Sequence, residues 1–303
     1  MRARFAVLVA VLVAPVIAQA QAAGFGPIVL QLPASTRAIG FGNAYVGVRD
    51  PEAVFYNPAQ LGVRPGIAIS AERYGSSATA TSFTNTFVFG TFGFGLGVQH
   101  LDYDIDVGGY PSAAPNGEAM IEGGTTSASS LVAAAAVEKA YKGIRWGVTA
   151  KVAEDRNVGA RDGVLLADVG AAKEISLVTV GVTVQNLGGS PRLLGTSAAL
   201  PTRVVLGAAA AGYPLGPFDL AASSAVSVRR GGRVAPMGGV ELTYVPIDGI
   251  SFAGRVGGRL PEKNAESPVT LGGSFTFDRI TFDYGFEPYQ GKGSGHRVGV
   301  RIR

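Results

Sequence analysis

Apolar and polar residues alternate along much of this chain, most clearly towards its C-terminus. In the stretch 280–287 (ITFDYGFE), large apolar residues occupy every even position, and polar or small residues occupy every odd position. The stretches 269–277 (VTLGGSFTF) and 144–153 (IRWGVTAKVA) have the same period of two. Successive side chains of a β-strand point to opposite faces, so this pattern predicts strands with one apolar face and one polar face.

The pattern, interrupted by turn residues, predicts fourteen strands in all. Their expected ranges are 65–74, 80–89, 92–103, 127–140, 143–155, 163–175, 177–187, 200–211, 217–229, 236–246, 249–260, 267–277, 279–288 and 295–303.

The connections between these strands alternate between short turns and longer loops. Short turns are expected at 90–91, 176 and 278–279, and longer loops at 104–126 and 188–199. Short turns at one end and long loops at the other are typical of outer-membrane barrels. An even number of strands brings both ends of the barrel to the short-turn side, so we expect both termini in the periplasm.

The hydropathy also favours a barrel that crosses a membrane. The mean hydropathy is +0.27 and charged residues make up only 16% of the chain. Beyond residue 22 there is no apolar run that could span a bilayer as a helix, and a closed barrel is the other structure whose backbone is satisfied in lipid. We therefore predict an all-β protein, a single 14-stranded antiparallel transmembrane β-barrel in contact with outer-membrane lipid. A secreted soluble β-sandwich is the alternative.

The tyrosines at strand ends suit interfacial positions: Tyr74, Tyr103, Tyr213, Tyr244 and Tyr289.

The N-terminal region has a different character. Residues 1–22 combine two arginines, an apolar run and A-x-A sites, which is typical of a signal peptide for export. Residues 23–64 are rich in glycine and turn residues and are predicted to be an N-terminal hatch or plug, and residues 65–303 the barrel. Asp50 can begin a short helix, and Asn57 followed by Pro58 ends it. These three residues are our candidates for hatch and ligand gating. A periplasmic strap outside the barrel is the alternative for this segment.

Composition excludes several classes of function. The net charge is +4, and it falls to +2 when Arg2 and Arg4 are removed with the signal, so nucleic-acid binding is not expected. The chain has no cysteine and two histidines, and it contains no hydrolase motif or metal-ligand cluster. We expect no enzymatic activity, no cofactor and no metal.

Charged residues also fall on the polar faces of the predicted strands. In a barrel this face lines the lumen, so we expect a hydrated or ion-paired interior that could also set ligand preference. The lumen-facing candidates are Arg145, Lys151, Arg255, Arg259, Asp283 and Arg297.

Three segments resemble a known family. The N-terminal block 36–61 (TRAIGFGNAYVGVRDPEAVFYNPAQL) resembles the opening motif of the PorV/PorQ family of outer-membrane proteins, and 184–188 (VQNLG) and 282–300 resemble later family patterns. That family is related to the FadL-like barrels, so the resemblance implies a fourteen-stranded barrel with an N-terminal hatch.

For function, the resemblance implies an accessory of protein secretion to the cell surface, of the type IX kind, with secretion-system components or exported cargo as partners. The wider FadL kinship implies the alternative, passive transport of hydrophobic small molecules across the bacterial outer membrane. The sequence does not separate the two.

Overall fold

A computed structural model describes residues 26–62, 65–75, 77–113, 119–157, 160–189, 192–193, 196–197, 199–260, 268–289 and 293–303. The expected signal peptide, residues 1–22, lies outside these described residues.

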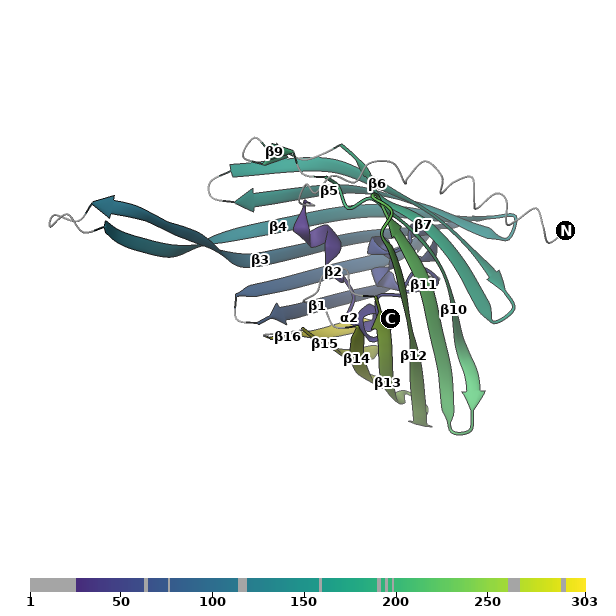
Figure 1. Cartoon of the computed structure of the whole chain (residues 1–303). Helices are drawn as coiled ribbons and strands as arrows, with labels where there is room; N and C mark the ends of the chain where they lie inside the picture. Colours follow the sequence, from purple (N-terminus) through teal and green to yellow (C-terminus); the bar gives the residue numbers. More distant parts are fainter. Residues whose placement is uncertain are drawn as a thin grey trace.

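The described chain forms one closed antiparallel barrel of fourteen strands, as predicted (Figure 1). Each strand pairs with its neighbours along the chain, and β1 pairs with β16 to close the ring. The barrel strands are β1 (Gly66–Tyr74), β2 (Ala78–Phe89), β3 (Phe92–Ala113), β4 (Ala119–Tyr141), β5 (Ile144–Asn157), β6 (Ala160–Ile175), β7 (Val178–Gly188), β10 (Arg203–Leu215), β11 (Phe218–Arg229), β12 (Val234–Ile247), β13 (Ile250–Arg259), β14 (Val269–Phe277), β15 (Ile280–Pro288) and β16 (Ser294–Ile302).

The alternation in the sequence maps onto the two faces of the barrel wall. Phe282 is 51% exposed on the outside, whereas its neighbour Asp283 is 5% exposed and faces the interior. On β5, Trp146 and Val148 are likewise exposed while Arg145 is buried. An apolar exterior around a polar interior is what a lipid environment requires of a barrel.

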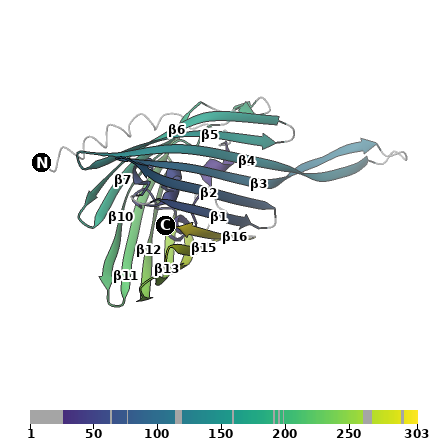
Figure 2. The same cartoon turned by 180° about the vertical axis from the view of Figure 1, so that it is seen from behind.

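The prediction of a loop at 104–126 was wrong, because most of this segment continues the two flanking strands. β3 and β4 pair from Asp104↔Ser127 to Ala113↔Ala119, whereas β2 ends opposite Tyr103. The two strands therefore project from the barrel as a ribbon, which extends well beyond all other strands (Figures 1 and 2). The loop between β7 and β10 also holds a small hairpin of β8 (Arg192–Leu193) and β9 (Thr196–Ser197).

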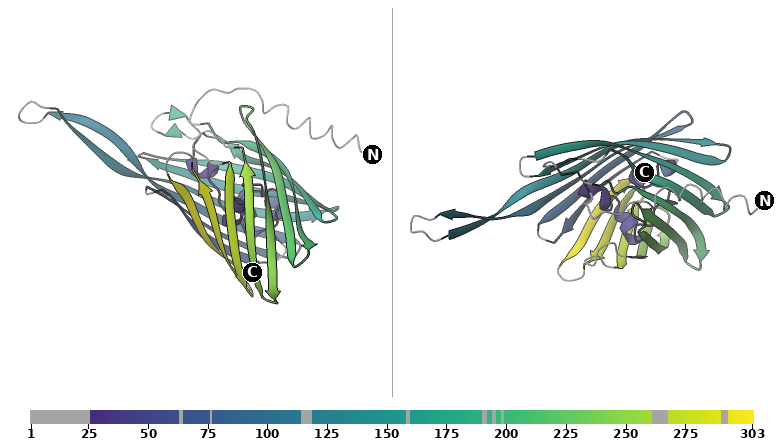
Figure 3. Two further views of the ribbon diagram at one scale, coloured as in Figure 1. Left: turned by 60° about the horizontal axis from the view of Figure 1, so that its bottom comes forward. Right: turned by 45° about the horizontal axis from the view of Figure 1, so that its top comes forward.

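The N-terminal segment fills the barrel as a plug, as predicted, and is not a strap outside it (Figure 3). It carries a 3-10 helix η2 (Ile28–Gln31), the α-helix α2 (Thr36–Gly40), and two further 3-10 helices, η3 (Pro51–Phe55) and η4 (Pro58–Gln60). Asp50 caps η3 by accepting a hydrogen bond from Glu52 N, and Asn57 caps η4 in the same way from Ala59 N. α2 contacts β12 to β16, η3 contacts β1 to β4, and η4 contacts β4 to β6.

The two ends of the barrel are distinct. Gly66 begins β1 and Ile302 ends β16, and the pair Ile67↔Ile302 lies near the short-turn end, as an even strand number requires. Gly26, the first described residue, lies instead at the long-loop end, where its backbone N–H donates to Ala199 O.

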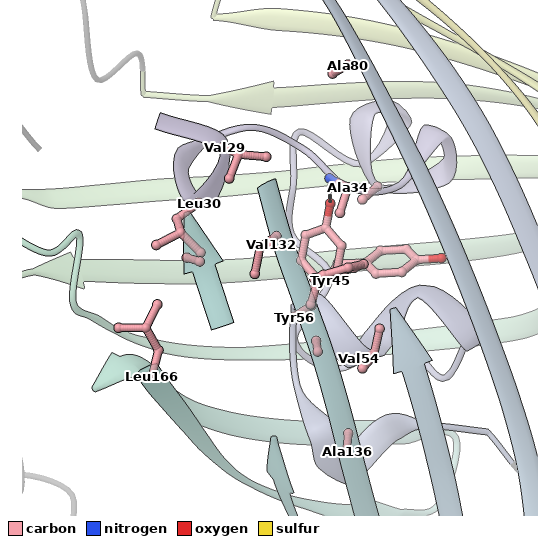
Figure 4. Close-up of a cluster of buried hydrophobic side chains, with 14 of the residues drawn as sticks. Val29, Leu30, Ala34, Tyr45, Val54, Tyr56, Ala80, Val132, Ala136 and Leu166 are labelled. Carbon is pink, nitrogen blue, oxygen red and sulfur yellow. Dashed lines mark hydrogen bonds between the residues drawn. The ribbon is translucent and has the colours of Figure 1, made fainter. Parts of the chain in front are cut away.

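Apolar side chains of the plug and the inner wall form a common core (Figure 4). The rings of Tyr45 and Tyr56 meet edge to face with centroids 5.1 Å apart. Tyr56 OH accepts a hydrogen bond from Ala34 N at 3.0 Å. These contacts fold the plug upon itself and against Val132 of β4.

Among the described residues, no helix is long and apolar enough to cross a bilayer.

The predicted interfacial tyrosines were wrong in three of five cases. Tyr213 and Tyr244 lie on the outer surface, 57% and 41% exposed. Tyr74 and Tyr289 instead line an internal cavity, and Tyr103 packs against the core. Each of these three tyrosines lies an even number of positions from inward-facing residues of its strand. This alternation, and not the position near a strand end, determines which face of the barrel wall a side chain occupies.

Candidate functional site: a plugged lumen with two cavities

The predicted gating residues lie inside the barrel, at the contact between plug and wall. Asn57 is fully buried, and its Nδ2 donates to Val46 O at 2.9 Å while its Oδ1 accepts from Ala59 N at 3.0 Å. The Asn57 side chain therefore holds two segments of the plug together, in addition to capping η4.

The Asn57–Pro58 turn fits into a slot made by glycines of the wall. A Cβ on Gly170 of β6 would lie 2.0 Å from Asn57 Oδ1, and one on Gly147 of β5 would lie 2.2 Å from the Pro58 carbonyl carbon. Only glycine permits so close an approach of the strand backbone. The slot was not predicted, because its glycines look in the sequence like ordinary small residues of a strand.

The third candidate, Asp50, is the centre of a buried ion-pair cluster. It is 1% exposed, and its Oδ2 accepts from Arg301 Nη1 and Arg303 Nη2, each at 2.9 Å. Arg37 Nη1 lies 3.7 Å from the same oxygen. Burial alone would raise the pKa of Asp50, but these three guanidinium groups outweigh it and lower that pKa to about 2.

Two residues further on, Glu52 is also buried, but no cation of the described residues lies at hydrogen-bonding distance from it. Its Oε2 accepts from Ser35 Oγ at 2.6 Å, and Ser35 in turn caps α2 through Ala38 N. Burial, together with the charge of Asp50, raises the pKa of Glu52 to about 8, so its carboxyl group is protonated at neutral pH.

The predicted lumen-facing charges do face the interior and are paired there. Arg297, which is fully buried, donates to Glu72 Oε2 at 2.8 Å and to the plug carbonyl Pro33 O at 2.6 Å. Arg145 donates to Gln60 Oε1 of the plug at 2.9 Å. The remaining pairs are Arg255 with Glu241 and Asp283, Arg259 with Glu287, and Lys151 with Asp168.

Several of these partners were not predicted. Glu72, Asp168 and Arg301 each have the inward parity of their strand, which was the available signal. Their pairing depends on which strands become neighbours and in what register. The alternation of residues along a single strand does not predict either of these.

Asn186 lies in the 184–188 motif, at an irregularity of the wall. Its backbone φ is +58°, and the pairing of β6 with β7 shifts between Ala167 and Val169. Asn186 N donates to Asp168 Oδ1 at 2.8 Å, and its Nδ2 donates to Pro201 O at 3.1 Å. The motif therefore builds the strand end, where asparagine tolerates the left-handed conformation.

One cavity opens at the long-loop end of the barrel, with a volume of about 560 Å³. We call it the long-loop cavity. Its floor is the plug, at Leu32, Val46 and Tyr56, and its wall carries Val205 and Met237. Polar groups share this lining. Among them are Asn43, Tyr74, Gln185, Arg203, Arg229, Arg259, Glu287 and Tyr289.

A second cavity, of about 790 Å³, opens at the opposite end beside the turn Asp278–Arg279. We call it the short-turn cavity. It shares no lining residue with the long-loop cavity, and Arg37 of the plug lies in its lining. Among the described residues, no group of three or more His, Cys, Asp or Glu side chains could hold a metal ion.

The fold is similar to those of solved outer-membrane transporters. The toluene transporter TodX of Pseudomonas putida matches with a TM-score of 0.58 and 11% identity, over 88% of this chain and 96% of that one. TbuX, the toluene transporter of Ralstonia pickettii, matches with a TM-score of 0.58 and 11% identity, over 92% and 98%. A FadL homologue of Pseudomonas aeruginosa matches with a TM-score of 0.54 and 12% identity, over 89% and 97%. No family model and no curated protein matches the sequence.

At these identities the similarity establishes the class of fold, a FadL-like fourteen-stranded barrel with an N-terminal plug. The neighbours are channels and transporters, which fits a protein without enzymatic activity. The narrower resemblance to PorV/PorQ is not among these matches.

Proposed function

We propose that this protein is a bacterial outer-membrane channel that admits hydrophobic small molecules, with the long-loop cavity as the first binding site. The observation that carries the proposal is this cavity above a plug, in a barrel shaped like known toluene transporters. Concave sites with apolar walls and a few polar groups are typical of small-molecule binding.

In this proposal the long-loop end faces the outside of the cell and the short-turn end faces the periplasm. The plug lies between the two cavities, so passage requires part of it to move. The predicted gating residues Asp50, Asn57 and Pro58 anchor the plug to itself and to the wall, and we propose that their contacts determine how readily it moves.

Uptake of labelled toluene by cells that express the protein in their outer membrane tests the proposal. Met237→Trp adds bulk to the wall of the long-loop cavity, and we expect it to reduce the initial uptake rate several-fold. Tyr213→Trp places the same ring on the outer surface and is the matched control, with expected uptake like that of the unmodified protein. If expression does not accelerate uptake, or if both variants behave alike, the channel proposal is wrong.

A specific observation favours a second candidate, the export accessory that the PorV/PorQ resemblance implies. From Asp104 to Ala113 and from Ala119 to Ser127, the β3–β4 ribbon has no further strand paired on either side among the described residues. Open strand edges are suited to adding a strand from another protein. Deletion of residues 105–125 should then abolish capture of a secretion partner while leaving toluene uptake intact. Unchanged capture would remove this candidate.

A further inference from the structure

The short-turn cavity differs chemically from the long-loop cavity, because hydrogen-bond donors dominate its lining. Five arginines line it: Arg37, Arg255, Arg279, Arg301 and Arg303. Five hydroxyl groups accompany them: Thr243, Ser251, Ser274, Thr276 and Thr281. The remaining residues are the carboxylates of Glu241 and Asp278, together with Pro65 and Ala253.

Guanidinium groups outnumber carboxylates around this cavity. Arg37 and Arg255 share Glu241, and Arg255 and Arg301 share Asp283. Asp50, which is not part of the cavity lining, forms ion pairs with Arg301 and Arg303 and lies near Arg37. Four arginines thus share three carboxylates. Arg279 and Asp278 at the turn bring the totals to five guanidinium groups and four side-chain carboxylates.

Two of the arginines are available to a ligand at the mouth of the cavity. The Arg303 side chain is 47% exposed, although one of its nitrogens bonds Asp50. The Arg279 side chain is exposed and has no hydrogen-bond or ion-pair partner within the described chain. The two residues are neighbours, since Arg303 N donates to Arg279 O at 3.0 Å.

We propose that the short-turn cavity binds a phosphoryl group, held by Arg279 and Arg303 at the mouth with the cavity hydroxyls behind them. Guanidinium forks match the oxygens of phosphate in pairs, and hydroxyl donors complete its hydrogen bonding. The bound anion also connects β16 to the β14–β15 turn, next to the ion pairs that join Arg301 to the plug through Asp50. Binding therefore stabilises the plugged form of the barrel by mass action. The proposal does not depend on what passes through the channel.

Titration of the purified full chain in an uncharged detergent tests the site. The probes are inorganic phosphate and glycerol 3-phosphate, followed by binding to vesicles of phosphatidylcholine with and without phosphatidylglycerol. We expect saturable phosphate binding that weakens with added salt. The double variant Arg279→Gln/Arg303→Gln should weaken it about tenfold or more, as expected when two charge-assisted contacts are lost. Preference for phosphatidylglycerol vesicles over free phosphate, lost in the same variant, would identify a lipid headgroup as the source of the phosphoryl group.

Arg230→Gln is the matched control, because it removes one exposed arginine at the opposite, long-loop end. Its affinity should equal that of the unmodified protein, and the heat-dependent gel shift of all variants should show a folded barrel. Equal affinity of the double variant and the unmodified protein would overturn the proposal. So would the absence of binding by any of these probes up to about 10 mM, the range of very weak complexes.

Discussion

At the scale of single residues, the plug contains two neighbouring carboxyl groups in opposite states. Asp50 is ionised because three arginines surround it, whereas the Glu52 carboxyl group accepts its hydrogen bond from the neutral hydroxyl of Ser35. A buried carboxyl without a cation is more stable when neutral. The positive charge of Arg301 acts to lower the pKa of Glu52, but the nitrogens of Arg301 are already bonded to Asp283 and Asp50.

The first prediction is that Glu52 makes the protein less stable as the pH rises. In the unfolded chain Glu52 loses its proton near pH 4.5, but in the folded protein it loses it near pH 8. Between these values the folded state binds the extra proton, so the free energy of unfolding falls with increasing pH. It is constant above about 8, and the total loss is at most about 5 kcal/mol. Glu52→Gln removes this titration, so its melting temperature should decline less from pH 5 to pH 8. Parallel profiles for the two proteins would show that Glu52 ionises normally.

Asn57 gives the second prediction. Replacement by Ala removes the donor to Val46 O and the acceptor for Ala59 N, both of which are buried. Loss of such contacts costs about 1–3 kcal/mol when the partners stay unpaired, too little to unfold a large barrel. We expect Asn57→Ala to assemble and insert, but to increase leakage of small solutes from liposomes or to weaken capture of a partner. Normal leakage and normal capture would mean that Asn57 has no gating role.

At the scale of elements, β5, β6 and β7 present a glycine-lined wall to the Asn57–Pro58 turn. The close approach of the turn explains why these inward-facing positions are glycines. Elsewhere on the inner wall such positions carry polar side chains. The same device recurs at β3, where a Cβ on Gly97 would lie 2.7 Å from the ring of Phe55. The interior glycines therefore lie where the plug approaches the barrel wall most closely.

The third prediction tests this fit. Gly170→Ala places a methyl group where the Asn57 amide lies, so the plug must shift, at a cost of about 1–3 kcal/mol for an overpacked site. We expect a lower melting temperature and faster tryptic cleavage within the plug. Gly254→Ala on β13 is the control, since a Cβ there meets no heavy atom within 4 Å and should leave both measurements unchanged. If the two variants are equally stable, the slot is not tightly packed.

The strands could be predicted because their information is local. Period-two alternation and turn residues defined the fourteen strands, and parity placed Arg145 and Arg297 inside. The β3–β4 ribbon was missed because its strands leave the sheet, where no apolar face is required and the alternation fades. The pairing of Arg297 with Glu72 could not be predicted from the sequence. It depends on the pairing of β1 with β16, which brings together residues more than 220 positions apart.

At the scale of the whole molecule, the plug and the barrel form one unit that differs between its ends. The long-loop cavity combines apolar side chains and tyrosines with Arg203, Arg229, Arg259 and Glu287 above the plug, whereas arginines and hydroxyl groups dominate the lining of the short-turn cavity. Under the two proposals, we expect a hydrophobic solute to bind at the first end and a phosphoryl anion at the second. This asymmetry has consequences for a cell only if the barrel has a fixed orientation in the membrane.

The last prediction concerns that orientation. We expect the long-loop end to face outward, because outer-membrane barrels carry short turns on the periplasmic side. The chain has no cysteine, so a single introduced cysteine can be labelled without background. Arg230→Cys lies beyond β11 at the long-loop end, and Asp248→Cys lies in the turn between β12 and β13. A membrane-impermeant maleimide should label the first in intact cells and the second only after the outer membrane is opened. Both side chains are exposed, so accessibility in the folded protein does not distinguish them, and the difference reports the side of the membrane alone. The reverse pattern would invert the barrel, and the long-loop cavity could then no longer be the outer binding site.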